Sequence, residues 1–269
     1  MITKLFFKEY DLISFGPYPP SSIYFNYNEN DTILLEKSDI AKCEKILQME
    51  LRSGKVIENH PLYRYLSLYE ISNGVVFNLG HTNFKEYLLT NFGHPEWSST
   101  SFKRKMSNPL SISSITVSLD HKILFGKRSS KVVSEPEKIQ TLPGGYVHPP
   151  DTLLNTVEKE LYEELLIRRY EIADITVNGL ALIHPSGKPE ILVVVHLNIP
   201  SSIVRRRHGV DEWEFSQIQL FTESREGIIQ FLSKNNETLT RASHASLVNY
   251  AIQNFGILSI SHILVKNMK

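Results

Sequence analysis

One stretch limits the fold of this chain more than any other: a glycine-containing turn that runs into an amphipathic helix. The turn is Leu142-Pro143-Gly144-Gly145, and helical periodicity follows over Thr152–Arg169. On a helix turning about 100° per residue, four apolar side chains of this segment fall within roughly 80° of one another. They are Leu154, Val157, Leu161 and Leu165. This helix needs a core to pack on, and the strands predicted on both sides of it supply a sheet.

The segments around this helix predict a mixed α/β (α+β) fold in which the second part forms an α/β sandwich. Alternating hydrophobic runs predict strands at Ile112–Leu119, Lys122–Phe125, Ile175–Ile183, Glu190–Leu197 and Phe215–Phe221. Two further helices are expected, one started by Thr222 and one at Leu239–Phe255 that ends before Gly256.

The first part of the chain also reads as mixed α and β. Strands are predicted at Leu5–Phe15 and Ile23–Tyr27, a helix after Ser38, a hairpin of Tyr63–Ile71 and Val75–Leu79 around Asn73-Gly74, and a short helix at Phe84–Leu89. Between Gly93 and Pro109 the periodicity lapses, and this lapse includes the basic run Lys103-Arg104-Lys105. We therefore predict an N-terminal mixed α/β domain at 1–105 and a second domain at 106–269.

Composition restricts the classes of function. A 41% hydrophobic fraction is ample for packed cores, and 29 basic residues balance 29 acidic ones. No global field favours nucleic acid or an anionic membrane, so a small-molecule partner is expected. The first residues do not resemble a secretory signal, and no apolar run is long enough for a membrane span. Cys43 is the only cysteine, which fits a cytoplasmic location and excludes an intrachain disulfide.

Three carboxylates cluster on one side of the predicted helix. Glu160, Glu163 and Glu164 lie within roughly 100° of one another, beside the apolar stripe and not opposite it. Like charges four residues apart repel, so a compensating charge is expected, and a hard divalent cation such as Mg²⁺ prefers carboxylate oxygen. The alternative is a solvated acidic face with Lys159 and Arg168 as partners. The preceding Gly144-Gly145 favours the first interpretation, because glycine tolerates positive φ and lets backbone approach an anionic ligand closely.

These residues resemble the sequence box of the Nudix hydrolase family. That box runs glycine, five residues, glutamate, seven residues, then Arg-Glu-apolar-any-Glu-Glu-any-Gly-apolar. This chain has Gly145, then Asp151 at the glutamate position, and residues 159–167 reading Lys-Glu-Leu-Tyr-Glu-Glu-Leu-Leu-Ile. Three positions depart from the pattern: Asp151 replaces glutamate, Lys159 replaces arginine, and Leu166 replaces glycine. Loss of that glycine predicts that the helix continues to Arg168 or beyond.

The resemblance implies an α/β/α sandwich, a divalent metal and a set of site residues. Glu160 and Glu164 would be the main ligands of Mg²⁺, with Mn²⁺ as a possible substitute, and Glu163 would bind directly or through water. Such enzymes often take a further carboxylate from outside the box. Of Asp211, Glu212 and Glu214, we favour Glu214 as an added ligand or general base, with a solvated loop acid as the alternative. Candidate phosphate contacts are Gly144, Gly145, Lys127, Arg128 and Arg206, and surface solvation is the alternative for the three cations.

A second resemblance lies upstream of the box. Residues 78–91, Asn-Leu-Gly-His-Thr-Asn-Phe-Lys-Glu-Tyr-Leu-Leu-Thr-Asn, are similar to a stretch in the UDP-sugar hydrolase group of Nudix proteins, although Leu89 stands where glycine is usual. The implied reaction converts UDP-glucose or UDP-galactose to UMP and a sugar 1-phosphate, with Thr90 and Asn91 as candidate substrate contacts. Two alternatives stay open: hydrolysis of ADP-ribose or another nucleoside diphosphate derivative, and a non-catalytic nucleotide-binding module.

Overall fold

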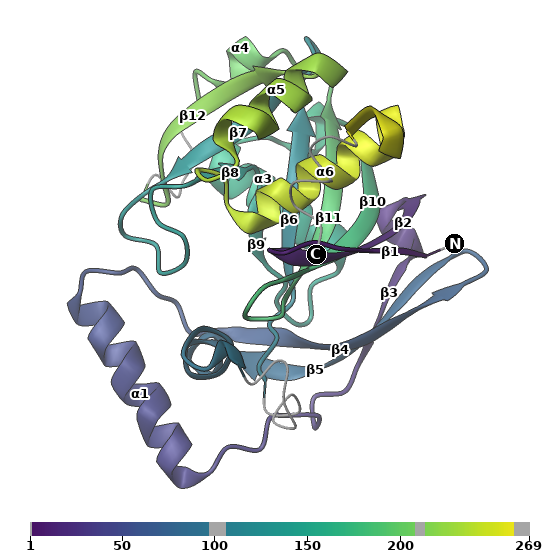
Figure 1. The fold of residues 1–269 in the computed structure, drawn as a ribbon. Helices are drawn as coiled ribbons and strands as arrows, with labels where there is room; N and C mark the ends of the chain where they lie inside the picture. Colours follow the sequence, from purple (N-terminus) through teal and green to yellow (C-terminus); the bar gives the residue numbers. More distant parts are fainter. Residues whose placement is uncertain (1, 97–105, 208–212, 261–269) are drawn as a thin grey trace.

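Strands and helices alternate along the chain in a mixed α/β arrangement, as the sequence predicts (Figure 1). The computed structural model describes residues 2–96, 106–207 and 213–260. The strands are β1 Thr3–Phe6, β2 Tyr10–Tyr18, β3 Ile23–Tyr27, β4 Pro61–Ile71, β5 Gly74–Asn83, β6 Ser111–Val117, β7 Lys122–Arg128, β8 Ile139–Thr141, β9 Gly144–Tyr146, β10 Ile172–Ile183, β11 Lys188–Leu197 and β12 Phe215–Thr222. The α-helices are α1 Lys37–Arg52, α2 Phe84–Tyr87, α3 Leu153–Leu165, α4 Ser201–Val204, α5 Arg225–Asn235 and α6 Arg241–Phe255.

The larger sheet has the order β1-β2-β10-β11-β6-β7-β12, with β8 paired to β7 and β9 to β6. Strands β6 and β11 run parallel, and the other pairs are antiparallel. Strand β9 is therefore a short segment on β6, placed immediately before the loop that leads into α3. This position brings the Gly144-Gly145 backbone beside that helix.

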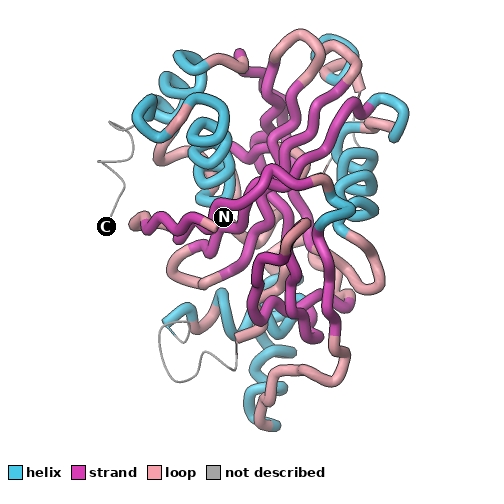
Figure 2. Tube along the Cα trace, turned by 90° about the vertical axis from the view of Figure 1, so that its right-hand side faces the viewer, coloured by secondary structure: helices cyan, strands magenta, loops and turns pink. Residues whose placement is uncertain are grey.

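Alternate residues of the central strand β11 face opposite helical layers. Ile191 and Val193 pack in one core cluster with Leu153 and Leu161 of α3. The intervening Leu192 lies in a second cluster with residues of α5 and α6. Since successive side chains of a strand point to opposite faces, α3 covers one face of the sheet and α5 with α6 covers the other. Figure 2 shows helices on both sides of the strands, which confirms the expected α/β/α layering.

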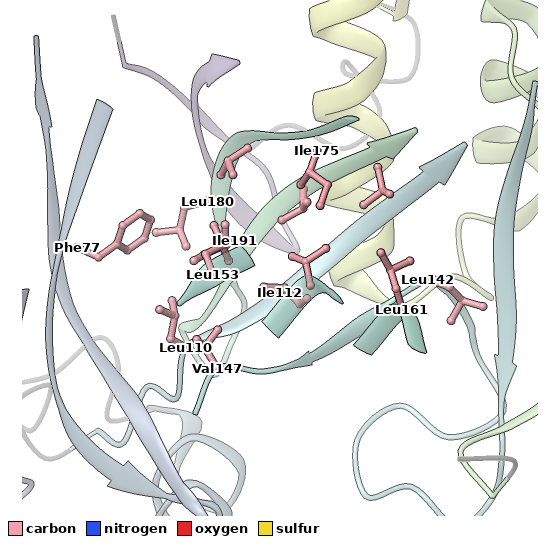
Figure 3. Close-up of a cluster of buried hydrophobic side chains, with 14 of the residues drawn as sticks. Phe77, Leu110, Ile112, Leu142, Val147, Leu153, Leu161, Ile175, Leu180 and Ile191 are labelled. Atoms are coloured by element: carbon pink, nitrogen blue, oxygen red, sulfur yellow. The ribbon is translucent and has the colours of Figure 1, made fainter. Parts of the chain in front are cut away.

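A second, three-stranded sheet has the order β3-β5-β4. Its Val75, Phe77 and Leu79 are buried in the same cluster as the α3 face of the larger sheet. In Figure 3 the ring of Phe77 lies against Leu180 of β10, and Leu161 of α3 lies near Leu142. The two sheets thus share one hydrophobic core, which fixes their position relative to each other.

The strand pairing crosses the domain division that the sequence predicts. The predicted N-terminal domain 1–105 contains β1 and β2, yet β2 pairs with β10 along Tyr10↔Ile183 to Tyr18↔Val177. Residues 97–105 of the proposed connection, which include its run Lys103-Arg104-Lys105, lie outside the described residues. The boundary near residue 105 stays a prediction, whereas the first two strands belong to the larger sheet. Pairing between segments so distant in sequence leaves no local pattern to read.

Three details of the predicted elements are wrong. Leu5–Phe15 is not one strand, because β1 and β2 form a hairpin with the turn between Phe6 and Tyr10. Helix α5 begins after Ser224, whose side chain accepts a hydrogen bond from Gly227 N–H, and not at Thr222. Helix α3 ends at Leu165, because Leu166 adopts a left-handed conformation with φ of 52°. The position where the family box has glycine therefore keeps the turn that glycine favours, made here by leucine.

Among the helices in the described part of the chain, none has the length and low polarity that crossing a membrane requires.

Candidate active site

A cavity of about 470 Å³ opens where α3, strand β9 and the segment from β5 into α2 meet. Its lining includes residues of α2, β9, α3 and the start of β11. Six of the predicted catalytic and phosphate-binding residues line it, whereas Glu164 does not. The six are Arg128, Gly144, Gly145, Glu160, Glu163 and Glu214. These residues from distant segments of the sequence therefore meet at one cavity.

The backbone of Gly145 lies directly against the carboxyl group of Glu160. A Cβ at Gly145 would overlap the carboxyl carbon and oxygens of Glu160, so only glycine leaves room for them. Neither Gly144 nor Gly145 has a positive φ, because both lie in β9 and pair with β6. The expectation of a left-handed glycine turn is thus wrong. The glycines matter because they let a side chain approach the strand closely.

Glu164 is the most deeply buried carboxylate of the cluster, with 5% of its surface exposed. The backbone N–H of Gly144 donates a hydrogen bond to its Oε1 at 3.1 Å. Its Oε2 is buried and has no hydrogen-bond partner among the described residues. Burial raises the pKa of Glu164 well above its usual range, and the charges of Glu214 and Glu160 raise it further. A nearby cation would relieve both the desolvation and the repulsion.

Glu214 comes from the segment just before β12 and reaches the cavity from the opposite side. Its Oε1 lies 3.5 Å from Nη1 of Arg128, and 19% and 13% of the two side chains are exposed. Arg128 also donates a hydrogen bond to Oε1 of Gln140. The expected meeting of Glu214 with the box carboxylates is supported by its electrostatic effect on Glu164. Arg128 lies beside these groups, where it balances part of the negative charge.

Glu163 and Lys159 fit the alternative interpretation better than Glu164 does. Lys159 Nζ lies 3.9 Å from Oε2 of Glu163, and 32% of the Glu163 side chain is exposed. This is the solvated pairing that the sequence left open. Glu163 nevertheless lines the cavity with Glu160, so it is placed to act through water.

Two predicted phosphate contacts point elsewhere. Lys127 Nζ forms an ion pair with Glu137 at 3.1 Å, and Arg206 Nε donates to the carbonyl oxygen of Ser202 at 3.0 Å. Neither residue is among those that line the cavity. Asp211 and Glu212, the other loop acids considered, lie outside the described residues.

The two upstream candidates are held by structural hydrogen bonds. The buried Thr90 hydroxyl donates to the carbonyl oxygen of Glu86, and Asn91 Nδ2 donates to Asn108 and to the Ser186 carbonyl oxygen. Asn91 lines the cavity and Thr90 does not. Thr90 is therefore a residue that holds the helical turn after α2 in place.

The sequence missed a second group of polar and aromatic residues in the cavity wall. Lys188 and Glu190 at the start of β11 form an ion pair, and Lys188 Nζ stands 4.5 Å from the ring centroid of Tyr146. All three line the cavity, as does Tyr87 of α2. The segment Lys188-Pro189-Glu190 gave no signal beyond the start of a strand, because the groups that complete the cluster come from distant segments.

The donor set fits a hard divalent cation in chemistry. The groups that converge near Gly144 and Gly145 are carboxylates, which Mg²⁺ prefers, and one carboxylate oxygen of Glu164 is buried with no hydrogen-bond partner in the described part of the chain. As the side chains stand, residues 2–96, 106–207 and 213–260 contain no three His, Cys, Asp or Glu side chains grouped closely enough to hold a metal.

Comparisons with known proteins give a limited likeness. No family model matches the chain, and no curated protein matches it. Similar solved structures include a MutT protein from Methanosarcina mazei Go1, 20% identical over 54% of this chain and 94% of that one, with a TM-score of 0.39. Another is a Nudix hydrolase from Nitrosomonas europaea, 11% identical over 54% and 88%, with a TM-score of 0.39. Similarity this low carries no conclusion about function, which depends on the site itself.

Proposed function

We propose that this chain is a Mg²⁺-dependent Nudix hydrolase that cleaves the pyrophosphate of UDP-glucose or UDP-galactose, giving UMP and a sugar 1-phosphate. The observation that carries the proposal is the position of Glu164. It is buried beside two further carboxylates, it accepts from the Gly144 backbone, and it keeps one oxygen without a partner in the described structure. Burial and the neighbouring carboxylates raise the pKa of Glu164, and a bound cation would offset this by favouring the ionised form.

Glu160 and Glu164 would hold the cation, with Glu163 acting through water and Glu214 as a further ligand or as the base. Mn²⁺ could replace Mg²⁺, since both accept oxygen ligands. When bound, the cation would neutralise the pyrophosphate and lower the pKa of a coordinated water. The chain's own contribution is to collect acidic oxygens at the backbone of β9, where the glycines leave space for them.

Glu214 is the proposed proton acceptor for the attacking water. It lines the cavity at a side chain 19% exposed, so water can reach it, and Arg128 stands 3.5 Å away. A carboxylate in this position can take the proton of the attacking water. Arg128 would also be available to a phosphate oxygen once the substrate displaces part of this pairing.

The substrate assignment rests on the resemblance of residues 78–91 to the UDP-sugar group, supported by the cavity. Phe84, Tyr87 and Asn91 of that stretch line the cavity wall, so the segment stands where it can contact a ligand. A volume of about 470 Å³ is within the range of small-molecule sites. We further propose a cytoplasmic location, which imaging of a tagged chain would test, and a small-molecule partner, not a nucleic acid or a membrane.

The test is hydrolysis of a panel containing UDP-glucose, UDP-galactose, ADP-ribose, a diadenosine compound and CoA, with and without Mg²⁺. Product identification by chromatography should show UMP and sugar 1-phosphate, formed fastest from the UDP-sugars. Preferential hydrolysis of ADP-ribose would overturn the substrate assignment and leave the pyrophosphatase assignment. No hydrolysis of any compound, with nucleotide binding retained, would identify a binding module.

A further inference from the structure

A buried ion pair stands in the cavity wall away from the carboxylate cluster. Lys188 Nζ lies 2.8 Å from Oε1 of Glu190, and only 17% and 8% of these side chains are exposed. Both residues line the cavity. Taking two charges out of water costs more than their mutual attraction usually returns, so such a pair is weak evidence for stability. Its place in a cavity wall points to a role in binding.

Aromatic rings surround this pair. Lys188 Nζ stands 4.5 Å from the centroid of the Tyr146 ring and 6.0 Å from that of Tyr87. Phe84 packs edge-on against Tyr146, with ring centroids 5.7 Å apart. All of these rings line the cavity. The wall therefore combines flat apolar surfaces with one ammonium donor and one carboxylate acceptor, which is the combination that binds a planar polar ring.

Sheet register sets the separation between this pair and the carboxylate cluster. Glu190 pairs with Ser111 of β6, and Ser111 pairs with Tyr146 of β9. The next residue of β9, towards the turn, is Gly145, which contacts the Glu160 carboxyl group. Two inter-strand spacings separate β9 from β11, or roughly 10 Å. Tyr146 and Glu190 thus stand at the same level on either side of β6, and Gly145, next to Tyr146, contacts the Glu160 carboxyl group.

We infer that Lys188, Glu190 and Tyr146 form the subsite for the nucleobase, in which Glu190 accepts a hydrogen bond from a ring N–H and Lys188 donates to the neighbouring carbonyl oxygen. This rests on the proposed function, which places a pyrophosphate at the carboxylate cluster. The imide edge of uracil fits the pair in either direction, because its N–H lies between two carbonyl groups. Cytosine and adenine carry no ring N–H on that edge and present an exocyclic amino donor beside a ring-nitrogen acceptor instead.

The sharpest test changes the substrate and leaves the protein untouched. UDP-glucose methylated at uracil N3 lacks the N–H, and the 5-methyl analogue adds the same bulk away from the imide edge. We expect the N3-methyl compound to lose about tenfold or more in kcat/KM, because hydrogen bonds to charged groups are among the strongest in proteins. The 5-methyl compound should stay within about threefold of UDP-glucose, because it keeps the imide edge intact. Equal turnover of the N3-methyl compound and UDP-glucose would overturn the subsite.

A protein variant then shows whether Lys188 and Glu190 recognise the N3–H of uracil. Lys188→Met with Glu190→Gln removes both charges together, which avoids leaving one buried charge unpaired. In this double variant the preference for UDP-glucose over its N3-methyl analogue should fall towards one. Lys42→Met with Asp39→Asn changes an exposed ion pair of α1 in the same way and should keep the wild-type preference. If the folded Lys188/Glu190 variant keeps the wild-type preference, other residues recognise the uracil N3–H and the proposal is overturned.

Calorimetric binding of UMP and of N3-methyl-UMP separates this inference from the proposed function. Binding that depends on the N–H, without hydrolysis of any UDP-sugar, would support the subsite and reject the enzyme assignment. Hydrolysis of UDP-glucose that ignores N3 methylation would support the enzyme assignment and reject the subsite. Absence of both N–H-dependent binding and hydrolysis would reject the two together.

Discussion

The backbone N–H of Gly144 donates a hydrogen bond to Oε1 of Glu164, at 3.1 Å across the gap between β9 and α3. This contact joins the glycines of β9 to the acidic helix α3, the two parts of the sequence that together suggest a catalytic box. It also turns Glu164 towards the interior, where burial and the charges of Glu214 and Glu160 raise its pKa. The raised pKa means that the surrounding protein alone disfavours the ionised form of Glu164, which a bound cation would favour.

Neutralising one of these carboxylates should abolish most of the activity without unfolding the chain. Glu164→Gln and Glu160→Gln keep the side-chain size and remove a ligand charge. We expect at least about a hundredfold loss in kcat/KM, on the order of 2.7 kcal/mol in the barrier. Unfolding in urea should show equal or higher stability, since repulsion falls. Glu158→Gln is the control and should stay near wild type. It removes another carboxylate of α3, which pairs with Arg169 beyond the end of that helix. Near-normal turnover by either site variant would place that carboxylate outside the active site.

Gly145→Ala should affect activity more than stability. The added Cβ would overlap the Glu160 carboxyl group, which is the far end of a flexible side chain and can move aside. The fold should lose about 1 kcal/mol or less, whereas kcat should fall about tenfold or more through the displaced carboxylate. Gly54→Ala is a control with the opposite expected effect. That glycine has φ of 85°, which strains an alanine, and open space around it. It should lose stability and keep activity. Full activity in Gly145→Ala would show that the position of Glu160 is unimportant.

Leu166 should be more sensitive to side-chain shape than its half-buried position suggests. Its φ of 52° is unfavourable for a leucine and worse for a β-branched residue. Leu166→Val should destabilise the chain by about 1–2 kcal/mol. Leu166→Gly should stay within about 1 kcal/mol of wild type, as relief of the backbone offsets the lost side chain. The same leucine to valine change at the exposed Leu119 is the control. Equal stability of the two valine variants would contradict the left-handed helix end.

Acid should weaken the fold through His244. Burial lowers the pKa of His244 to about 4, and Tyr10 Oη lies 2.9 Å from its Nδ1. The unfolded chain takes up a proton near pH 6.5 and the folded chain does not, so stability is complete above that pH and is lost as pH falls towards 4. Between about pH 7.5 and pH 5 this group should account for about 2 kcal/mol of lost stability.

Urea unfolding at the two pH values measures this loss. His244→Gln should show a smaller loss than wild type, whereas the more exposed His94→Gln should show the wild-type loss. An identical pH dependence in wild type and His244→Gln would mean that His244 is protonated equally in both states.

Local sequence patterns predicted much of the fold and the carboxylates of the candidate site. The spacing of Glu160, Glu163 and Glu164 beside an apolar stripe was enough to place them at the margin of the core, because helix geometry is regular. The predicted continuation of the helix past Leu166 was wrong. A residue's identity indicates its preferred φ only statistically, and the surrounding packing overrode the preference of leucine. The expected left-handed turn at Gly144-Gly145 is instead part of β9, and the space that these glycines leave for side chains depends on atoms that only tertiary structure brings together.

Long-range pairing accounts for the features that the sequence did not indicate. Nothing local joins β2 to β10, and nothing near Lys188 indicates that Tyr146 and Tyr87 will stand beside it. Lys127 and Arg206 were reasonable phosphate contacts by charge alone, and their side chains instead bind Glu137 and Ser202. Charge type is visible in a sequence, whereas the direction of a side chain relative to a cavity depends on the completed core.

The most direct test of the central claim is the identity of the products formed from UDP-glucose, with Mg²⁺ and again in excess chelator. We expect UMP and glucose 1-phosphate in equal amounts with Mg²⁺, recovery with Mn²⁺ after chelation, and no turnover in chelator, because the carboxylates alone cannot neutralise a pyrophosphate. Turnover that persists undiminished in excess chelator, or intact UDP-glucose after prolonged incubation with Mg²⁺, would contradict the proposed function.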